Sequence, residues 1–180
     1  ADLRYDPGDN VHLDLSLNTD FAQVEADDEQ VNLTRFPLFF PEKRQFFQER
    51  AGVFDFDFGS GGRLFHSRQI GLAPDRTPIR MLGGARVVAR AGAWDLAALG
   101  VQTERRDGIA SENLGVTRIR RRVFNPFSYA GGMVTSRVDG DGNYNVATGL
   151  DASVRVFGND YLTTRSAATF DGQEATPSLA

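Results

Sequence analysis

Short turn signals recur at a fixed interval in the second half of this chain, and this interval constrains the fold more than any other feature. Gly92, Asn125 and Gly158 each lie in a turn-like context and stand 33 residues apart. Polar stretches at residues 104–113 and 138–143 fall between them, with the charges and glycines of exposed loops. Each interval has room for two strands of about 10 residues, one short turn and one long loop, which is the rhythm of an outer-membrane β-barrel.

We therefore predict an all-β chain whose antiparallel strands follow one another in up-and-down order. Residues 79–170 have room for roughly six strands, and the smallest bacterial barrels have about eight. The chain should then form part of an outer-membrane-type barrel without closing alone. Residues 1–62 are expected to form an N-terminal hairpin plus an irregular aromatic-rich segment. Residues 63–180 are expected to form the consecutive strands, and the whole is a single incomplete domain.

The expected strands alternate apolar and polar residues with a period of two. Residues 79, 81, 85, 87 and 89 are apolar and alternate with Arg80, Arg86 and Arg90, and residues 150–156 alternate similarly. We predict that the apolar set faces lipid and the polar set faces the interior. Residues 94–103 and 127–137 have small residues on both faces, so the pattern does not orient them.

Two features mark the short-turn end of the expected strands. Arg118, Arg120 and Arg122 share one face, whereas Arg121 stands on the apolar face. A lipid-facing arginine costs about 0 to 1 kcal/mol near an interface, and Arg121 directly precedes a short turn. Aromatic residues flank the same turns, as an interfacial girdle would: Trp94, Phe124, Phe127, Phe157 and Tyr161.

The N-terminal third combines one regular strand with an irregular segment. Residues 11–17 alternate strictly, and the preceding residues 6–10 suit a turn, so residues 3–5 should form the partner strand. Pro37 and Pro41 interrupt any regular element, yet phenylalanines crowd residues 30–58. We predict that this segment packs against the strand wall or constricts the barrel. Glu42, Lys43 and Arg44 should be paired with polar groups, and the flanking phenylalanines should be buried.

Composition excludes several classes of protein. With no cysteine and two histidines, the chain cannot build a disulfide framework, a thiol nucleophile or a polyhistidine metal centre. A net charge of −4 gives no attraction for nucleic acid, and no apolar run is long enough for a membrane-spanning helix. We expect no cofactor, no metal and no catalytic residue. The chain begins at Ala1 without a signal-like segment, so we expect any export signal to lie upstream.

Two groups of residues are candidates for ligand binding. The first lines the expected interior and comprises Arg80, Arg86, Arg90, Arg118, Arg120 and Arg155. Their guanidinium groups suit anionic or sugar-like solutes, although ion pairing with Asp95, Asp151 and neighbours is the structural alternative. The second group is Glu42, Lys43 and Arg44, which form either a ligand site or a charged turn held by aromatic side chains. Acidic residues 25–29 and Glu42 would be the carboxylates of a glycan-active enzyme.

Residues 19–47 carry a family resemblance through the elements DFAQVEAD, QVNLTRF and LFFPEKR, and the later stretch LFHSRQIG is similar too. The run resembles uncharacterised bacterial domains that follow a carbohydrate-binding family-nine-like module and are thought to form outer-membrane barrels. The resemblance implies a bacterial outer-membrane location, contact with lipid, no nucleic-acid partner and an upstream carbohydrate-binding-like domain. We expect a non-enzymatic role in binding or passing a polar solute such as a saccharide. The alternative is a soluble or envelope-associated glycan-active hydrolase or glycan-binding β-protein.

Overall fold

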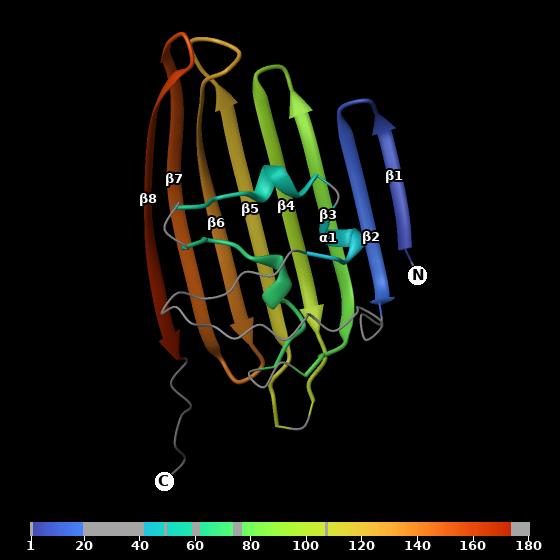
Figure 1. The fold of residues 1–180 in the computed structure, drawn as a ribbon. Helices are drawn as coiled ribbons and strands as arrows, with labels where there is room; N and C mark the ends of the chain where they lie inside the picture. Colours follow the sequence, from blue (N-terminus) through green and yellow to red (C-terminus); the bar gives the residue numbers. More distant parts are fainter. Residues whose placement is uncertain are drawn as a thin grey trace.

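The computed structural model describes residues 2–19, 42–48, 50–58, 62–73, 77–106 and 108–173. Eight strands form one antiparallel sheet in chain order, β1-β2-β3-β4-β5-β6-β7-β8, with β1 and β8 at opposite edges (Figure 1). Their bounds are β1 Asp2–Gly8, β2 Val11–Thr19, β3 Met81–Ala91, β4 Trp94–Thr103, β5 Glu112–Arg122, β6 Tyr129–Asp139, β7 Asn143–Phe157 and β8 Asp160–Gln173. The predicted all-β, up-and-down architecture is confirmed, including the N-terminal hairpin, and the sheet is not closed.

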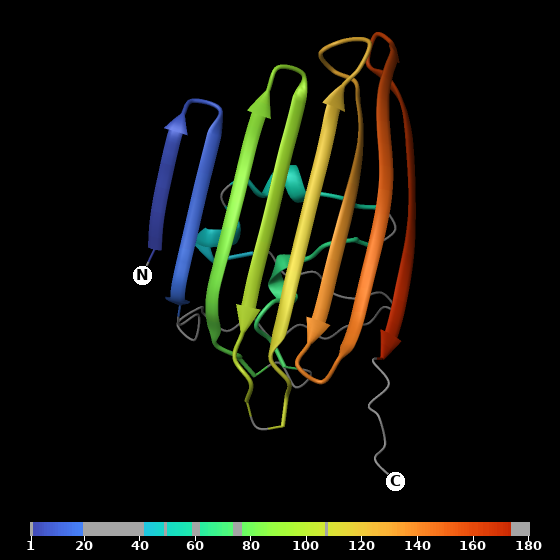
Figure 2. The ribbon, with the colours of Figure 1, turned by 180° about the vertical axis from the view of Figure 1, so that it is seen from behind.

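An irregular segment crosses one face of the sheet. It consists of the described part of residues 42–80, with α1 Gln45–Gln48 and the 3-10 turns η2 Ala51–Phe54 and η3 Ser67–Gln69. We call it the covering segment. It lies in front of the strands in Figure 1 and behind them in Figure 2, so we call the face it contacts the inner face and the opposite face the outer face. Among the described residues, no helix has the length and apolar character needed to cross a membrane.

The four turns β1–β2, β3–β4, β5–β6 and β7–β8 lie together at one end of the sheet (Figure 2). Gly92 and Gly158 have φ of 58° and 48°, in the left-handed region that glycine adopts without steric penalty. In the β5–β6 turn, the side-chain oxygen of Asn125 accepts hydrogen bonds from the Phe127 N–H and the Ser128 hydroxyl. The three turn positions predicted from the 33-residue spacing are confirmed.

The expected alternation of short and long connections is wrong at one place. Only residues 140–142 join β6 to β7, whereas residues 123–128 join β5 to β6. The Asp139 carboxylate accepts hydrogen bonds from the backbone N–H groups of Asp141 and Asn143, and Gly142 has a φ of 86°. These contacts close a tight hairpin, so the polar stretch at 138–143 extends the two strands instead of forming a long loop.

Alternation places opposite chemistry on the two faces. The outer face carries large apolar side chains that stay exposed: Leu3, Tyr5, Leu15, Leu17, Trp94, Leu96, Ile119, Val134, Val138, Tyr144, Leu150, Val156, Leu162 and Phe170. Strand register aligns Leu96, Ile119 and Leu150 in one row across β4, β5 and β7. The inner face carries Asp14, Arg86, Arg118 and Asp151, all buried beneath the covering segment.

Two residues expected on the lipid side lie instead in the protein interior. A register shift between Met81 and Gly83 inserts an extra residue in β3, and Met81 is only 1% exposed. Such a bulge reverses which face the preceding residues point to, because side chains alternate with a period of two. Ile79 lies before β3 begins, where its N–H donates to the Gly71 carbonyl of the covering segment.

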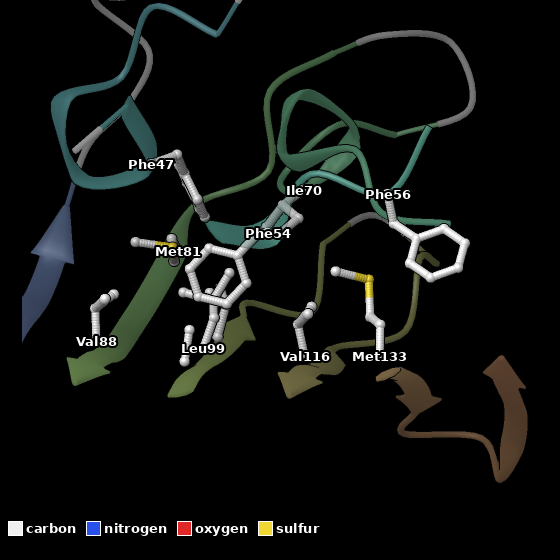
Figure 3. Close-up of a cluster of buried hydrophobic side chains, with 11 residues drawn as sticks. Phe47, Phe54, Phe56, Ile70, Met81, Val88, Leu99, Val116 and Met133 are labelled. Carbon is white, nitrogen blue, oxygen red and sulfur yellow. The ribbon is translucent and has the colours of Figure 1, made fainter. Parts of the chain in front are cut away.

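The hydrophobic core lies between the covering segment and the inner face (Figure 3). Phe47, Phe54, Phe56 and Ile70 supply one side, and the strands supply the other: Met81, Val88, Ala97, Leu99, Val101, Val116 and Met133. The predicted burial of the phenylalanines that flank residues 42–44 is confirmed at Phe47, and Phe46 packs against the core. Further along the segment Phe54 and Phe56 are buried as well, while Phe58 is 37% exposed. Positions 36, 39 and 40 lie outside the described residues.

Candidate functional site

Glu42 and Arg44 form an ion pair at the start of the covering segment. We call this pair, together with its hydrogen-bond partners, the Glu42–Arg44 cluster. The Arg44 Nε and Nη2 atoms donate to the two Glu42 carboxylate oxygens, each at 2.8 Å. Arg44 also donates to the carbonyls of Ser67 and Ile70, and its guanidinium lies 4.3 Å from the centroid of the Phe47 ring. These contacts therefore hold the start of α1 against η3. The predicted pairing is confirmed for Glu42 and Arg44, and the Lys43 backbone N–H donates to Glu42 Oε1 at 3.1 Å.

The contacts within the Glu42–Arg44 cluster keep the Glu42 carboxyl ionised. Burial alone would raise the pKa of its carboxyl, but the hydrogen bonds and positive charge of Arg44 outweigh burial and hold the pKa below its ordinary value. The Ser67 hydroxyl, which donates to Glu42 Oε2 at 2.7 Å, acts in the same direction. An ionised carboxylate is a poor proton donor at neutral pH. The geometry therefore gives Glu42 a structural role in the Glu42–Arg44 cluster.

Arg86 anchors the covering segment to the β2 side of the sheet. Its Nη2 atom lies 2.6 Å from Asp14 Oδ2 on the adjacent strand, and the pair is buried. The same guanidinium donates to the Phe46 carbonyl and lies 5.5 Å from the Phe46 ring centroid. The absence of a side chain at Gly84 leaves room for that ring, because a Cβ there would stand 3.1 Å from Phe46 Cζ.

Arg118 anchors the other side in the same manner. It donates two hydrogen bonds to Asp151, at 2.7 and 2.6 Å, and its guanidinium lies 5.3 Å from the Phe56 ring centroid. The pair meets across β6, where a Cβ on Gly131 would stand 3.2 Å from the Asp151 carboxylate. A Cβ on Gly149 would approach Phe56 to 2.7 Å. Glycine at these two positions therefore leaves room for the ion pair and for the ring.

The remaining candidate arginines lie apart from these anchors. Arg90 pairs with Asp95 at 2.6 Å, Arg120 lies over the Tyr129 ring and Arg155 over the Phe127 ring, all toward the short-turn end. Arg80 is exposed at the opposite end, where its carbonyl accepts from the Glu104 N–H. Five of the six arginines are thus spread along the inner face and are not gathered into one site. Arg80 stands exposed between the buried Ile79 and Met81, so the bulge in β3 turns it away from the inner face and the prediction that it lines the interior is wrong. Ion pairing with Asp95 and Asp151 is observed, and ligand binding by these residues stays a prediction.

Two cavities open between the covering segment and the strands. The larger, of about 430 Å³, is lined by residues 64–66, 68–70, 72 and 73 on one side and by β5, β6 and β7 on the other. Its strand side supplies Glu112, Arg137 and Asn145. The smaller, of about 300 Å³, lies toward Arg86 and Leu99, and both cavities share Phe65 and His66. Sequence reasoning missed these cavities, because strand alternation says nothing about residues 64–73.

His66 stands between the two cavities in a positive environment. Burial lowers the pKa of its imidazole, and the charge of nearby Arg63 lowers it further, while Glu42 acts in the opposite direction. The ring is therefore neutral at pH 7, when one nitrogen donates and the other accepts. Among the described residues, no cluster of histidine, aspartate and glutamate side chains could hold a metal ion.

Comparison with known proteins identifies one family. A model described as a domain of unknown function, DUF5916, matches residues 1–97, which include the N-terminal hairpin, the covering segment, β3 and the start of β4. No curated protein and no solved structure matches the chain.

Proposed function

This chain belongs to the DUF5916 family, a domain of unknown function, and we propose that it forms part of the wall of an outer-membrane β-barrel. In this proposal the outer face contacts lipid and the covering segment lies inside the barrel. The cavities between segment and wall bind or pass a polar solute, such as a saccharide. Further strands would pair with the free edges of β1 and β8 to complete the barrel.

One observation carries this proposal, namely the exposed apolar outer face. Leu150 in the middle of β7 is 67% exposed, and Leu162 and Leu17 on other strands are exposed to 68% and 63%. Soluble monomers rarely expose contiguous apolar patches larger than a few hundred Å². A barrel wall has this pattern for a physical reason, because hydrocarbon replaces water on its outside.

The larger cavity supports the solute-binding part of the proposal. Its lining places the Phe65 ring beside the polar side chains of Arg137, Glu112 and Asn145. Arg137 donates to Glu112 and Asn145 donates to Asp171, so a solute would bind through their remaining donors and acceptors. A saccharide has hydroxyl groups that donate and accept, together with apolar ring faces, so it matches this lining. The resemblance to domains that follow a carbohydrate-binding module supports the same solute class. For the alternative hydrolase, the ion pair with Arg44 makes Glu42 a poor general acid, and residues 25–29 lie outside the described residues.

The location is tested by membrane fractionation of the full-length protein. We expect recovery with the outer membrane, and recovery in the soluble periplasm would favour a soluble sandwich whose second layer covers the outer face.

The solute is tested by planar-bilayer conductance with added saccharide. We expect Arg137→Gln in the cavity to change conductance or ion selectivity. The matched control is Arg105→Gln, whose side chain pairs with Asp141 between exposed loops. Equal behaviour of the two variants would contradict a role for this cavity.

A further inference from the structure

Arg121 is the residue that the alternation pattern leaves unexplained. It lies on the outer face of β5, whereas Arg118 and Arg120 of the same strand lie on the inner face. Its cross-strand partner is Trp94 of β4, and the Arg121 guanidinium lies 5.1 Å from the centroid of the Trp94 ring. Trp94 is itself 40% exposed, so the stacked pair lies at the surface of the outer face.

The Arg121 guanidinium keeps its hydrogen-bonding capacity. Within the described part of the chain it makes no hydrogen bond or ion pair, and the Trp94 ring is its one recorded contact. Stacking occupies a flat face of the guanidinium and leaves the N–H donors at its edge directed outward. Arg120 and Arg122 lie on the other face, where Arg120 stacks on the Tyr129 ring and Arg122 donates to the Gly92 carbonyl, so Arg121 is the arginine that this end of β5 presents on the outer face.

The adjoining turn holds an aromatic ring outward under strain. Phe124 is 90% exposed and has a φ of 61°, a left-handed conformation that bulky residues rarely adopt. Strain of this kind persists when the surroundings enforce it, and here the Asn125 side chain and the bond from the Val123 N–H to the Ser128 carbonyl fix the turn. At the neighbouring turn Phe157 is 77% exposed. Exposed rings at one end of the strands are typical of an interfacial aromatic girdle.

We propose that Arg121 and Trp94 form a binding site for the phosphate of an anionic phospholipid headgroup. A planar guanidinium fork matches the geometry of phosphate oxygens, and the Arg121 guanidinium pairs with no carboxylate among the described residues. The exposed rings of Phe124 and Phe157 lie at the same end and fit the boundary between headgroups and acyl chains. The inference rests on the proposed membrane location and adds to it the class of lipid and the residues that bind it.

The test is lipid retention by the full-length protein, purified from vesicles that contain phosphatidylglycerol and phosphatidylcholine and analysed by native mass spectrometry. A surface arginine contributes about 1 kcal/mol toward anionic lipid, so Arg121→Gln should retain about fivefold less phosphatidylglycerol. Arg122→Gln is the matched control, since it removes the same charge from the opposite face one residue away. Arg121→Lys, which keeps the charge without the fork, should give intermediate retention.

Equal phosphatidylglycerol retention by Arg121→Gln and Arg122→Gln would overturn the site. Equal retention of the two lipids by the unaltered protein would overturn it as well, because phosphatidylcholine also carries a phosphate and the site would then have no preference for an anionic headgroup. Recovery of the unaltered protein from the soluble periplasm would overturn both this inference and the proposed location. That result comes from fractionation before any lipid is counted, so the two failures are distinguishable.

Discussion

The inner and outer faces of the sheet are built by the same strands, yet they follow opposite rules. On β7, Leu150 points outward and is 67% exposed, while the next residue, Asp151, points inward and is 5% exposed. A soluble sheet buries the apolar residue and exposes the charge. The contrast shows that the inner face combines buried ion pairs with a hydrophobic core beneath the covering segment, whereas the outer face leaves large apolar side chains uncovered.

The covered inner face shows how buried charges are stabilised in this fold. Arg86 with Asp14 and Arg118 with Asp151 are ion pairs, and each arginine lies beneath a phenylalanine of the covering segment. Burying a charge is costly unless it is paired and hydrogen-bonded. Both arginines are paired with a carboxylate and donate hydrogen bonds to it, and Arg118 Nε is the one buried nitrogen of the two guanidinium groups without a partner among the described residues. The same arrangement at two places anchors the covering segment on both sides of the sheet.

The largest expected effect comes from breaking the buried Arg118–Asp151 pair. Arg118→Ala leaves a buried carboxylate without its partner and should cost about 3–5 kcal/mol of unfolding free energy. The measurement is denaturant unfolding of the full-length protein in detergent. Arg90→Ala is the control, because its pair with Asp95 is exposed on the arginine side, and about 0–1 kcal/mol is expected. Equal losses for the two variants would show that the inner face is not a dry, covered surface.

The second prediction concerns the outer face at the middle of β7. Leu150→Arg should cost about 2–4 kcal/mol if that position meets the centre of a bilayer. In a soluble protein with Leu150 in water, the same substitution should change stability by less than about 0.5 kcal/mol. The measurement is the yield of folded protein in the outer-membrane fraction together with its unfolding free energy. An unchanged yield and stability would contradict contact with lipid.

How far the sequence predicts these two faces depends on how local the determining contacts are. Turn positions at Gly92, Asn125 and Gly158 follow from residues within the turns themselves, and alternation within strands predicts the face of Leu150 and Asp151. The buried position of Met81 could not be predicted, because a bulge one residue away reverses the face to which it points. The short connection at residues 140–142 could not be predicted either, because it depends on hydrogen bonds from its backbone to the Asp139 side chain.

The candidate site depends on contacts between distant residues, which explains why prediction was weaker there. Arg118 meets Asp151 across the intervening strand β6, and Gly131 on that strand leaves room for the Asp151 carboxylate. The larger cavity joins residues 64–73 to β5, β6 and β7. The packing of residues 42–58 was predictable in outline, because so many phenylalanines between charged residues need a protein surface to cover them.

A smaller effect is expected where the covering segment touches the wall. Gly149→Ala would place a Cβ 2.7 Å from the Phe56 ring and 2.8 Å from Leu64. Overpacking of this kind costs about 1–3 kcal/mol and should increase proteolysis of the covering segment. Gly100→Ala on the outer face is the control, since no atom lies within 4 Å of its added Cβ. If limited proteolysis is the same for both variants, the segment does not rest on Gly149 as described.

The smallest effect should be the pH dependence contributed by His66. Its pKa is lowered in the folded state from an ordinary value of 6.5, so the unfolded chain binds a proton more readily than the folded one. Stability from this group is therefore complete above the ordinary value and declines as the pH falls below it. Denaturation midpoints should decrease between about pH 7.5 and 5.5, and His66→Gln should reduce that decrease. An identical decrease in the variant would contradict the role of His66.

The central claim is that the outer face meets lipid while the inner face is covered, and spin-label accessibility tests it most directly. This chain has no cysteine, so single cysteines at positions 146, 147, 148 and 150 of β7 can carry a nitroxide label. With the full-length protein in a bilayer, labels at 146, 148 and 150 should collide with oxygen and not with a water-soluble nickel reagent. The label at 147, on the inner face, should collide with neither. Nickel access at the even positions, or protection there from both reagents, would contradict the account, because the outer face would then meet water or a second layer of protein.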